Sequence, residues 1–402
     1  MEIGPILRAL SRNKLGVILI SLQIAFTMTV MVNAVFIINE RSKLMARPSG
    51  LDEPNTFYLS STGFGDQFNS EVTERDDLEL LRNPPGIIDA TPTNAIPVSG
   101  SGSSDGVRIE NDPTLPATPA AVYFTDEHSV NTMNLTLIVG ENFSASDMTY
   151  QSSNERRYYS KAIVTLALAE KLFPGEGLAA VGKSFYRDQA PVQIVGIVER
   201  LQAPWPNSFF VEQSVLVPLN FTNATSTYLI RTEPGQRDRL MVEIEETLAG
   251  NNPNRIIRGL KSLQETREES YRLDSSMATI LLVVIVTLVF ITSMGIVGLA
   301  VFGINRRRKQ IGTRRALGAT QLQIMRYFML ENFFVSGVGV SISAVLTIAF
   351  SIALSSLFEM PTMSWYYTPL GMLILIAIGQ LAVLGPSARA ARIQPAIATR
   401  SI

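Results

Sequence analysis

The sequence predicts a membrane protein with four transmembrane α-helices and an α+β extracytoplasmic domain inserted between the first and second helices. Three observations lead to this fold class: four long apolar runs, a largely polar block at residues 41–274, and basic clusters beside the runs. With 402 residues, the chain is long enough for two or three domains.

The four apolar runs cover residues 15–38, 277–304, 327–358 and 367–388. About 20 apolar residues cross a bilayer as a helix, and each run reaches that length. The second and third runs are longer than required, so we expect these helices to tilt or to project beyond the membrane. A cleaved signal peptide is the alternative interpretation of the first run. Its length and the lack of a clear small-residue cleavage site favour a helix.

Basic residues predict the orientation of the helices, because loops on the cytosolic side are rich in Lys and Arg. Clusters lie before the first run, after the second and after the fourth. They comprise Arg8, Arg12, Lys14, Arg306, Arg307, Arg308, Lys309, Arg314, Arg315, Arg389, Arg392 and Arg400. If all three clusters are cytosolic, both termini are inside and residues 41–274 are outside.

Charge and composition exclude several kinds of site. Residues 41–274 hold 21 basic and 31 acidic side chains, whereas the rest of the chain holds 13 and 4. This asymmetry favours an acidic soluble block joined to a basic membrane part. There is no Cys and one His, His128, so disulfides, Cys-based sites and His-cluster metal sites are excluded. We expect no metal, no catalytic residues and no nucleic-acid partner.

The soluble block mixes strand and helix patterns without a regular repeat, which favours an α+β domain. Strands are predicted at 163–165, 192–198, 215–217 and 228–231, and helices at 166–173, 237–248 and 265–274. The last of these helices is expected to lead into the second run. The Ser/Gly tract at 99–106 and the Pro-rich segment 113–119 read as loops, and residues 110–190 as a possible inserted sub-domain.

One segment matches the phosphate-loop pattern GxxxxGK[ST] through Gly177, Gly182, Lys183 and Ser184. A true phosphate loop follows a buried strand and opens a helix. Here the segment follows a predicted helix and leads towards a strand, so we interpret it as a turn and not as a nucleotide site.

Two residues leave alternatives open. Glu331, near the start of the third run, reads either as an interfacial carboxylate paired with Arg326 or as a proton or substrate site. Trp205 reads either as a partner contact in an exposed aromatic loop or as a buried residue in a strand connection.

Residues 310–320, with Ile324 and residues 328–332, resemble the signature of FtsX/MacB-type ABC-transporter permeases. Residues 8–14 and 386–395 resemble the opening and closing segments of that family. In the soluble block, residues 140–147, 169–173, 181–183 and 192–198 resemble the MacB-like periplasmic core. The last resemblance implies that residues 181–183 form a structural turn of the family.

The resemblance implies that the cytosolic segment 305–322 couples the permease to an ABC ATPase. The implied coupling residues are Arg308, Lys309, Gln310, Ile311, Gly312, Arg314, Arg315, Ala316, Leu317 and Gly318. The arginines would pair with acidic groups of the ATPase, and Ile311, Ala316 and Leu317 would supply apolar contact. Gln310 stands where the family usually has Glu, and residues 396–400 also depart from the family pattern.

The implied organisation is a first helix in residues 1–40, a periplasmic core in 41–274 and an FtsX-like domain in 275–402. The function implied is that of a permease subunit in the bacterial inner membrane, which works as a homodimer or with a paralogue and contacts lipid. It would bind no cofactor, because a separate ATPase chain would use ATP to move the periplasmic domain. Efflux with a periplasmic adaptor and an outer-membrane channel is expected. Lipoprotein release and non-transporting signal transduction are the alternatives.

Overall fold

The computed structural model describes residues 4, 14–65, 68–152, 158–358 and 361–393. The chain forms two compact units, a helical unit of Met1–Lys43 with Asp274–Ile402 and an α+β unit of Leu44–Leu273. Some predictions fall outside the described residues. They concern the basic residues Arg8, Arg12 and Arg400, residues 8–13 of the first terminal family segment, and residues 394–400 near the other end of the chain.

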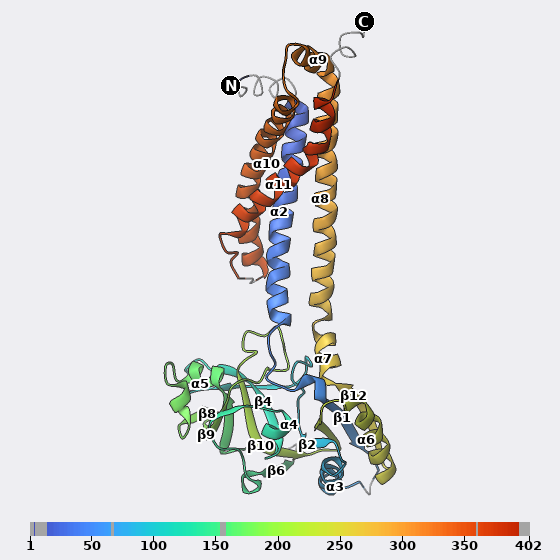
Figure 1. Cartoon of the computed structure of the whole chain (residues 1–402). Helices are drawn as coiled ribbons and strands as arrows, with labels where there is room; N and C mark the ends of the chain where they lie inside the picture. The colour runs from blue at the N-terminus through green and yellow to red at the C-terminus, as the bar shows by residue number, and fades with distance from the viewer. Residues whose placement is uncertain (1–3, 5–13, 66–67, 153–157, 359–360, 394–402) are drawn as a thin grey trace. The chain divides into compact units, whose positions relative to one another are not determined.

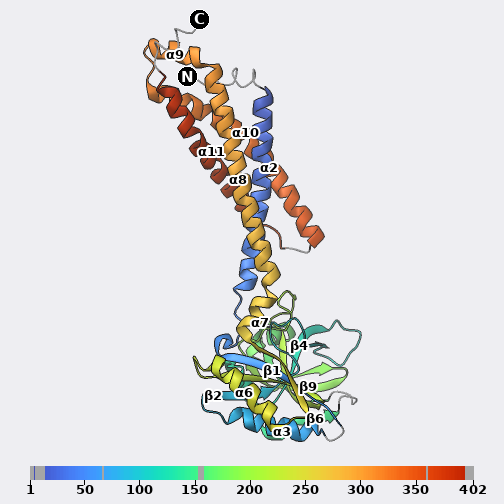
Figure 2. The same cartoon turned by 90° about the vertical axis from the view of Figure 1, so that its right-hand side faces the viewer.

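Four helices are long and apolar enough to cross a membrane: α2 (Lys14–Met45), α8 (Arg272–Arg306), α10 (Gln321–Phe358) and α11 (Tyr367–Ala391). Together with the α+β unit between the first two, they confirm the predicted fold class (Figures 1 and 2). The helices are longer than the apolar runs because mostly polar residues continue them by up to two turns. The predicted runs were defined by hydropathy alone, which does not detect polar residues at the ends of a helix.

Small and hydroxyl-bearing side chains bring α2 and α10 together. A Cβ on Gly339 would lie 2.9 Å from Cβ of Ile24, so only glycine leaves room there. One turn further on, the Ser343 hydroxyl donates to the Ala25 carbonyl at 2.9 Å. The hydroxyls of Thr27 on α2 and Thr292 on α8 lie 2.7 Å apart. Close backbone approach and interhelical hydrogen bonds are the usual means by which helices associate in lipid.

The α+β unit contains a four-stranded antiparallel sheet in the order β12-β1-β11-β2. Its strands are β1 (Thr56–Gly63), β2 (Ile87–Pro92), β11 (Thr225–Thr232) and β12 (Arg255–Ser262). Two helices, α3 (Ser70–Arg82) and α6 (Arg237–Asn251), pack on this sheet with Tyr228 and Ile230.

A larger mixed sheet has the order β3-β4-β10-β7-β9-β5, with β6 paired to β10 and β8 to β9. Its strands are β3 (Ser103–Val107), β4 (Thr118–Thr125), β5 (Leu137–Gly140), β6 (Thr149–Ser152), β7 (Lys161–Thr165), β8 (Ser184–Arg187), β9 (Ala190–Val198) and β10 (Ser214–Thr222). The remaining helices of the unit are α4 (Ser129–Thr132), α5 (Leu166–Leu172) and α7 (Leu263–Ser270), with short 3-10 turns at Glu53–Asn55, Ala145–Asp147 and Gly177–Ala180.

Strand alternation divides the side chains between separate cores. Val215 and Val217 on β10 face the cluster that includes α5, whereas Leu216 faces the core between the two sheets. Leu229 on β11 enters the same central core, while its neighbours face α3 and α6. Side chains alternate between the two faces of a strand, so each of these strands serves two cores.

Two expectations about the α+β unit need correction, the loop at 99–106 and the uninterrupted helix at 265–274. Residues Ser103–Val107 form the edge strand β3, which pairs with β4, and not a loop. The sequence pattern did not predict this strand because an edge strand can be polar. The larger sheet runs from 103 to 222, and the possible inserted sub-domain at 110–190 stays a prediction. The helix predicted at 265–274 is interrupted at Tyr271, between α7 and α8.

Trp205 belongs to a strand connection, as one of its two interpretations stated. Its half-buried ring packs against the central core and meets the Phe210 ring edge-on at 6.0 Å. The neighbouring Phe209 is 86% exposed. The exposed aromatic surface of this loop is therefore Phe209 and not Trp205.

Candidate functional site

The predicted coupling segment contains a short helix, α9 (Arg308–Ala316), between α8 and α10. Gly318 ends it with φ +95°, a conformation that favours glycine. The Ala319 amide donates to the Arg314 carbonyl at 3.0 Å and the Gly318 amide to the Arg315 carbonyl at 3.2 Å. These two bonds form a Schellman motif, which satisfies the last carbonyls of the helix and turns the chain.

A capping box then starts α10. The Gln323 amide donates to Oγ1 of Thr320 at 3.2 Å, and the Thr320 amide donates to Oε1 of Gln323 at 2.8 Å. This reciprocal pair satisfies two of the donors that a helix N-terminus leaves free. Both signals, Gly318 and the Thr320–Gln323 spacing, are present in the sequence. They separate α9 from α10.

The two faces of α9 differ in exposure. Ile311 is 4% exposed and, with Gly312, lies against the helical bundle. Between residues 308 and 318 the exposed residues are Arg308, Lys309, Gln310, Thr313, Arg314, Ala316, Leu317 and Gly318, and Leu317 is 83% exposed. Ile311 therefore offers little surface to a partner, whereas Leu317 is open to one. The coupling roles of both residues stay predictions.

The two arginines near the end of α9 already have contacts within the unit. The Arg314 guanidinium lies 5.2 Å from the centre of the Tyr327 ring. Arg315 is half-buried, and its Nη1 donates to the Ala319 carbonyl at 2.7 Å. Arg308 and Lys309 are exposed and carry positive charge at the start of the helix.

Arg307, which precedes α9, pairs with Glu331 on α10. Its Nη1 lies 2.8 Å from Oε2 of Glu331 and its Nη2 lies 3.0 Å from Oε1, so both prongs of the guanidinium are used. Nη1 also lies 3.3 Å from the Tyr327 hydroxyl. The expected pairing of Glu331 with Arg326 is wrong, because residues five apart point about 140° away from each other on a helix.

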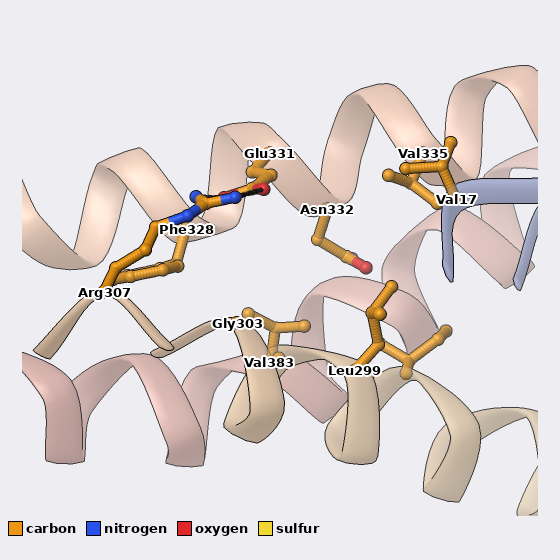
Figure 3. A pocket seen from close by; sticks show the side chains of 11 residues that line it. Val17, Leu299, Gly303, Arg307, Phe328, Glu331, Asn332, Val335 and Val383 are labelled. Atoms are coloured by element: carbon orange, nitrogen blue, oxygen red, sulfur yellow. Dashed lines mark hydrogen bonds and ion pairs between the residues drawn. The ribbon is translucent and has the colours of Figure 1, made fainter. Parts of the chain in front are cut away.

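A cavity of about 50 Å³ lies beside this pair. Figure 3 shows the Arg307 guanidinium against the Glu331 carboxylate, and the Asn332 side chain directed away from α10 towards Leu299. The rest of the lining is mostly apolar and comes from all four long helices: Val17, Ile296, Leu299, Ala300, Phe328, Val335 and Val383. The polar groups of this junction therefore gather on α10 and at the end of α8.

The phosphate-loop match lies in the α+β unit and has a different geometry from a nucleotide site. Gly177 begins a 3-10 turn and Ser184 begins strand β8. The Gly177 amide donates to the Glu170 carboxylate at 3.2 Å, and the Gly182 amide donates to the Ile194 carbonyl at 2.8 Å. The Lys183 ammonium pairs with Glu176 and lies 4.8 Å from the Phe173 ring centre.

The hydrogen bond from Lys183 lowers the pKa of the Glu176 carboxyl. The Glu176 carboxylate is therefore charged at neutral pH, and the lysine that would hold a phosphate has a carboxylate partner. Across the described residues, no group of three or more His, Cys, Asp or Glu side chains is placed to hold a metal ion.

Two family models match the chain. The MacB-like periplasmic core domain matches residues 15–248, and the FtsX-like permease C-terminal domain matches residues 282–395. The segment α9 and the Arg307–Glu331 pair lie within the second match. The cavity lining lies there too, except for Val17 of α2, which belongs to the first match.

Individual relatives agree with these models. The macrolide export ATP-binding/permease protein MacB of Pasteurella multocida is 22% identical over 89% of this chain and 53% of its own length. The pyoverdine export ATP-binding/permease protein PvdT of Pseudomonas savastanoi is 22% identical over 90% of this chain and 53% of its own length. The chain thus spans about half the length of these relatives.

Among solved structures, the periplasmic region of MacB from Actinobacillus actinomycetemcomitans is 13% identical. The match covers 56% of this chain and 97% of that one, with a TM-score of 0.35. Since the core-domain model alone covers more than half of the chain, this protein belongs to the family of FtsX-like ABC-exporter permeases with a MacB-like periplasmic core domain.

Proposed function

We propose that the chain is a permease subunit that couples ATP hydrolysis by a separate ABC ATPase to movement of its α+β unit. The observation that carries the proposal is the exposure of α9 and the residue after it: Leu317 is 83% exposed, and Arg308 and Lys309 at the start of the helix are exposed cations. An exposed leucine among basic side chains on a short helix suits a partner surface with an apolar pocket and an acidic rim.

The proposal places α9 and both termini in the cytosol and residues 41–274 in the periplasm, in a bacterial inner membrane. The basic residues Arg306, Arg308 and Lys309, next to the end of α8, support this orientation. Basic residues close to the end of a membrane span favour the cytosolic side of the membrane, where ATP is available.

The names of the relatives favour export as the purpose of the movement. Those relatives are named for the export of macrolides and of pyoverdine. We therefore propose efflux, with a periplasmic adaptor and an outer-membrane channel as further partners, ahead of lipoprotein release and signal transduction. ATP would be bound by the ATPase chain alone, and this subunit would hold no cofactor.

The outer surface of α8 supports a second copy or a paralogue as a further partner. Ile280, Val286, Phe290 and Met294 are each at least 60% exposed on this helix. Side chains of this kind suit lipid or another apolar helix. A dimer would bury part of this surface and leave the remainder in contact with lipid.

Co-purification from the native host tests the proposal. We expect the full-length chain in mild detergent to bring down an ABC ATPase in near-equal amount, identified by mass spectrometry. Leu317→Glu should weaken this association about tenfold or more, because burying a leucine contributes about 1.5–3 kcal/mol.

Leu178→Glu is the matched control, since Leu178 is 50% exposed but lies in the α+β unit. It should bind the ATPase as the wild type does. A folded wild-type chain without any ATPase would contradict the proposed function. Undiminished binding by Leu317→Glu would show that α9 is not the docking face.

A further inference from the structure

Arg307 occupies a distinct position between two helices. It is the N-cap residue of α9, with φ −106° and ψ 14°, and follows directly on the end of α8. Its guanidinium reaches across to α10, where it contacts the Glu331 carboxylate at 2.8 and 3.0 Å. One side chain therefore links the end of α8, the start of α9 and the body of α10.

Partial burial and a two-pronged geometry strengthen this pair and fix its orientation. The Arg307 and Glu331 side chains are only 19% and 17% exposed, so water screens the pair less than it screens a surface ion pair. A two-pronged contact with a carboxylate also fixes the plane of the guanidinium, which a single contact does not. Tyr327 contacts both Arg307 and Arg314, so residues near both ends of α9 contact the same tyrosine.

The adjoining cavity is large enough to hold water beside the pair. Its volume of about 50 Å³ exceeds the roughly 10–15 Å³ that one water molecule requires. Asn332 and the ion pair supply hydrogen-bonding groups to it. Water in this space would solvate either charge if the pair opened, which lowers the cost of separating the two side chains.

We propose that Arg307 is a positioning residue that sets the orientation of α9, through its pair with Glu331 and its contact with Tyr327. In the paired state the exposed face with Leu317 is held in one orientation for the ATPase. When the pair opens towards the cavity, α9 is free to reorient about the turn at Gly318. The role in docking rests on the proposed function, whereas the effect on α9 orientation does not.

A distance measurement on the full-length chain tests the positioning itself. The chain contains no cysteine, so Thr313→Cys on α9 and Leu322→Cys on α10 carry unique spin labels. Both positions are exposed and lie outside the pair. We expect a narrow distance distribution in the labelled parent, and a broadened or shifted one in Arg307→Glu and in Glu331→Arg.

The double variant Arg307→Glu with Glu331→Arg should restore the narrow distribution, because it restores the pair with reversed charges. Glu331→Gln removes the charge with little change of shape and serves if a charge reversal fails to fold. Arg326→Gln is the matched control, since Arg326 is an exposed cation on α10 for which the structure shows no ion pair. It should match the parent.

ATPase association of the same variants, without labels, then tests the docking role. The single reversals should lower the affinity about tenfold, and the double variant should recover most of it. Unchanged distance distributions in Arg307→Glu, Glu331→Arg and Glu331→Gln would overturn the positioning role, whatever the ATPase does. Broadened distributions with no ATPase bound even by the parent would instead overturn the proposed function and, with it, the docking role of Arg307.

Discussion

Both carboxylate oxygens of Asp77 lie 2.6 Å from Nη1 of Arg255, and neither side chain is exposed to solvent. Asp77 belongs to α3 and Arg255 to β12, so the pair joins a helix to the edge of the four-stranded sheet. The Tyr228 hydroxyl donates to Oδ2 of Asp77 at 2.9 Å. Burial nevertheless raises the pKa of Asp77, with the Arg255 and Tyr228 hydrogen bonds acting in the opposite direction.

This balance predicts an asymmetric response to mutation. Asp77→Ala should destabilise the α+β unit by about 3–5 kcal/mol, because it leaves the Arg255 charge buried without a partner. Replacing both residues, as in Asp77→Leu with Arg255→Met, should cost much less, since the desolvation of both charges is removed as well. The measurement is the temperature at which this unit of the full-length chain becomes sensitive to protease. Equal loss in the single and double variants would contradict this account.

Helix packing gives a second prediction, with two glycines two residues apart on α10. A Cβ on Gly339 would lie 2.9 Å from both Cβ of Ile24 and the Ser21 carbonyl oxygen, whereas nothing lies within 4 Å of a Cβ on Gly337. Gly339→Leu should therefore destabilise the helical unit by about 1–3 kcal/mol through overpacking, and Gly337→Leu should have little effect. Thermal unfolding in detergent measures both. Comparable losses in the two variants would show that α2 and α10 do not pack through Gly339.

Hydropathy and charge were sufficient to predict the four spans and the inserted domain, because each span is a long local signal. The ends of the helices depend on shorter signals. The turn at Gly318 and the capping pair Thr320–Gln323 are present in the sequence, but an interpretation based on apolar runs passes over them. As a result α10 begins at Gln321, six residues before the predicted start at 327.

Contacts between distant segments were harder to predict. Arg307 and Glu331 are equally far from Ala319, and residues placed in this way can meet across an antiparallel helix pair, but this follows only once the turn is known. The inward direction of Ile311 likewise depends on how α9 rests on the bundle, which a nine-residue helix does not reveal by its periodicity. The edge strand β3 was not predicted because its residues are mostly polar.

A third prediction concerns acid stability. The hydrogen bond from Lys161, together with those from the amide and hydroxyl of Ser144, lowers the pKa of the Asp147 carboxyl to about 2. An unfolded Asp titrates near pH 3.9, so ionised Asp147 stabilises the folded chain above about pH 4. That contribution is lost as the pH falls towards 2.

Asp147→Asn should therefore be less stable than the wild type at neutral pH, and the difference should shrink between about pH 4 and pH 2. Thermal unfolding of both chains across this range measures the difference. Glu245→Gln removes an exposed carboxylate for which the structure shows no ion pair and serves as the control. A difference between Asp147→Asn and wild type that stays constant down to pH 2 would contradict the assigned pairing.

The fourth prediction concerns the phosphate-loop match. In a nucleotide site, backbone amides and the lysine must be free to hold phosphate oxygens. Here the Gly175 and Gly177 amides donate to the Glu170 carboxylate at 3.0 and 3.2 Å, and Lys183 pairs with Glu176. A phosphate would have to displace two carboxylates and would meet their negative charge at close range.

The purified chain, free of ATPase, should therefore show no Mg-ATP binding by calorimetry, and Lys183→Ala should behave as the wild type does. Saturable binding that Lys183→Ala abolishes would make this segment a nucleotide site after all.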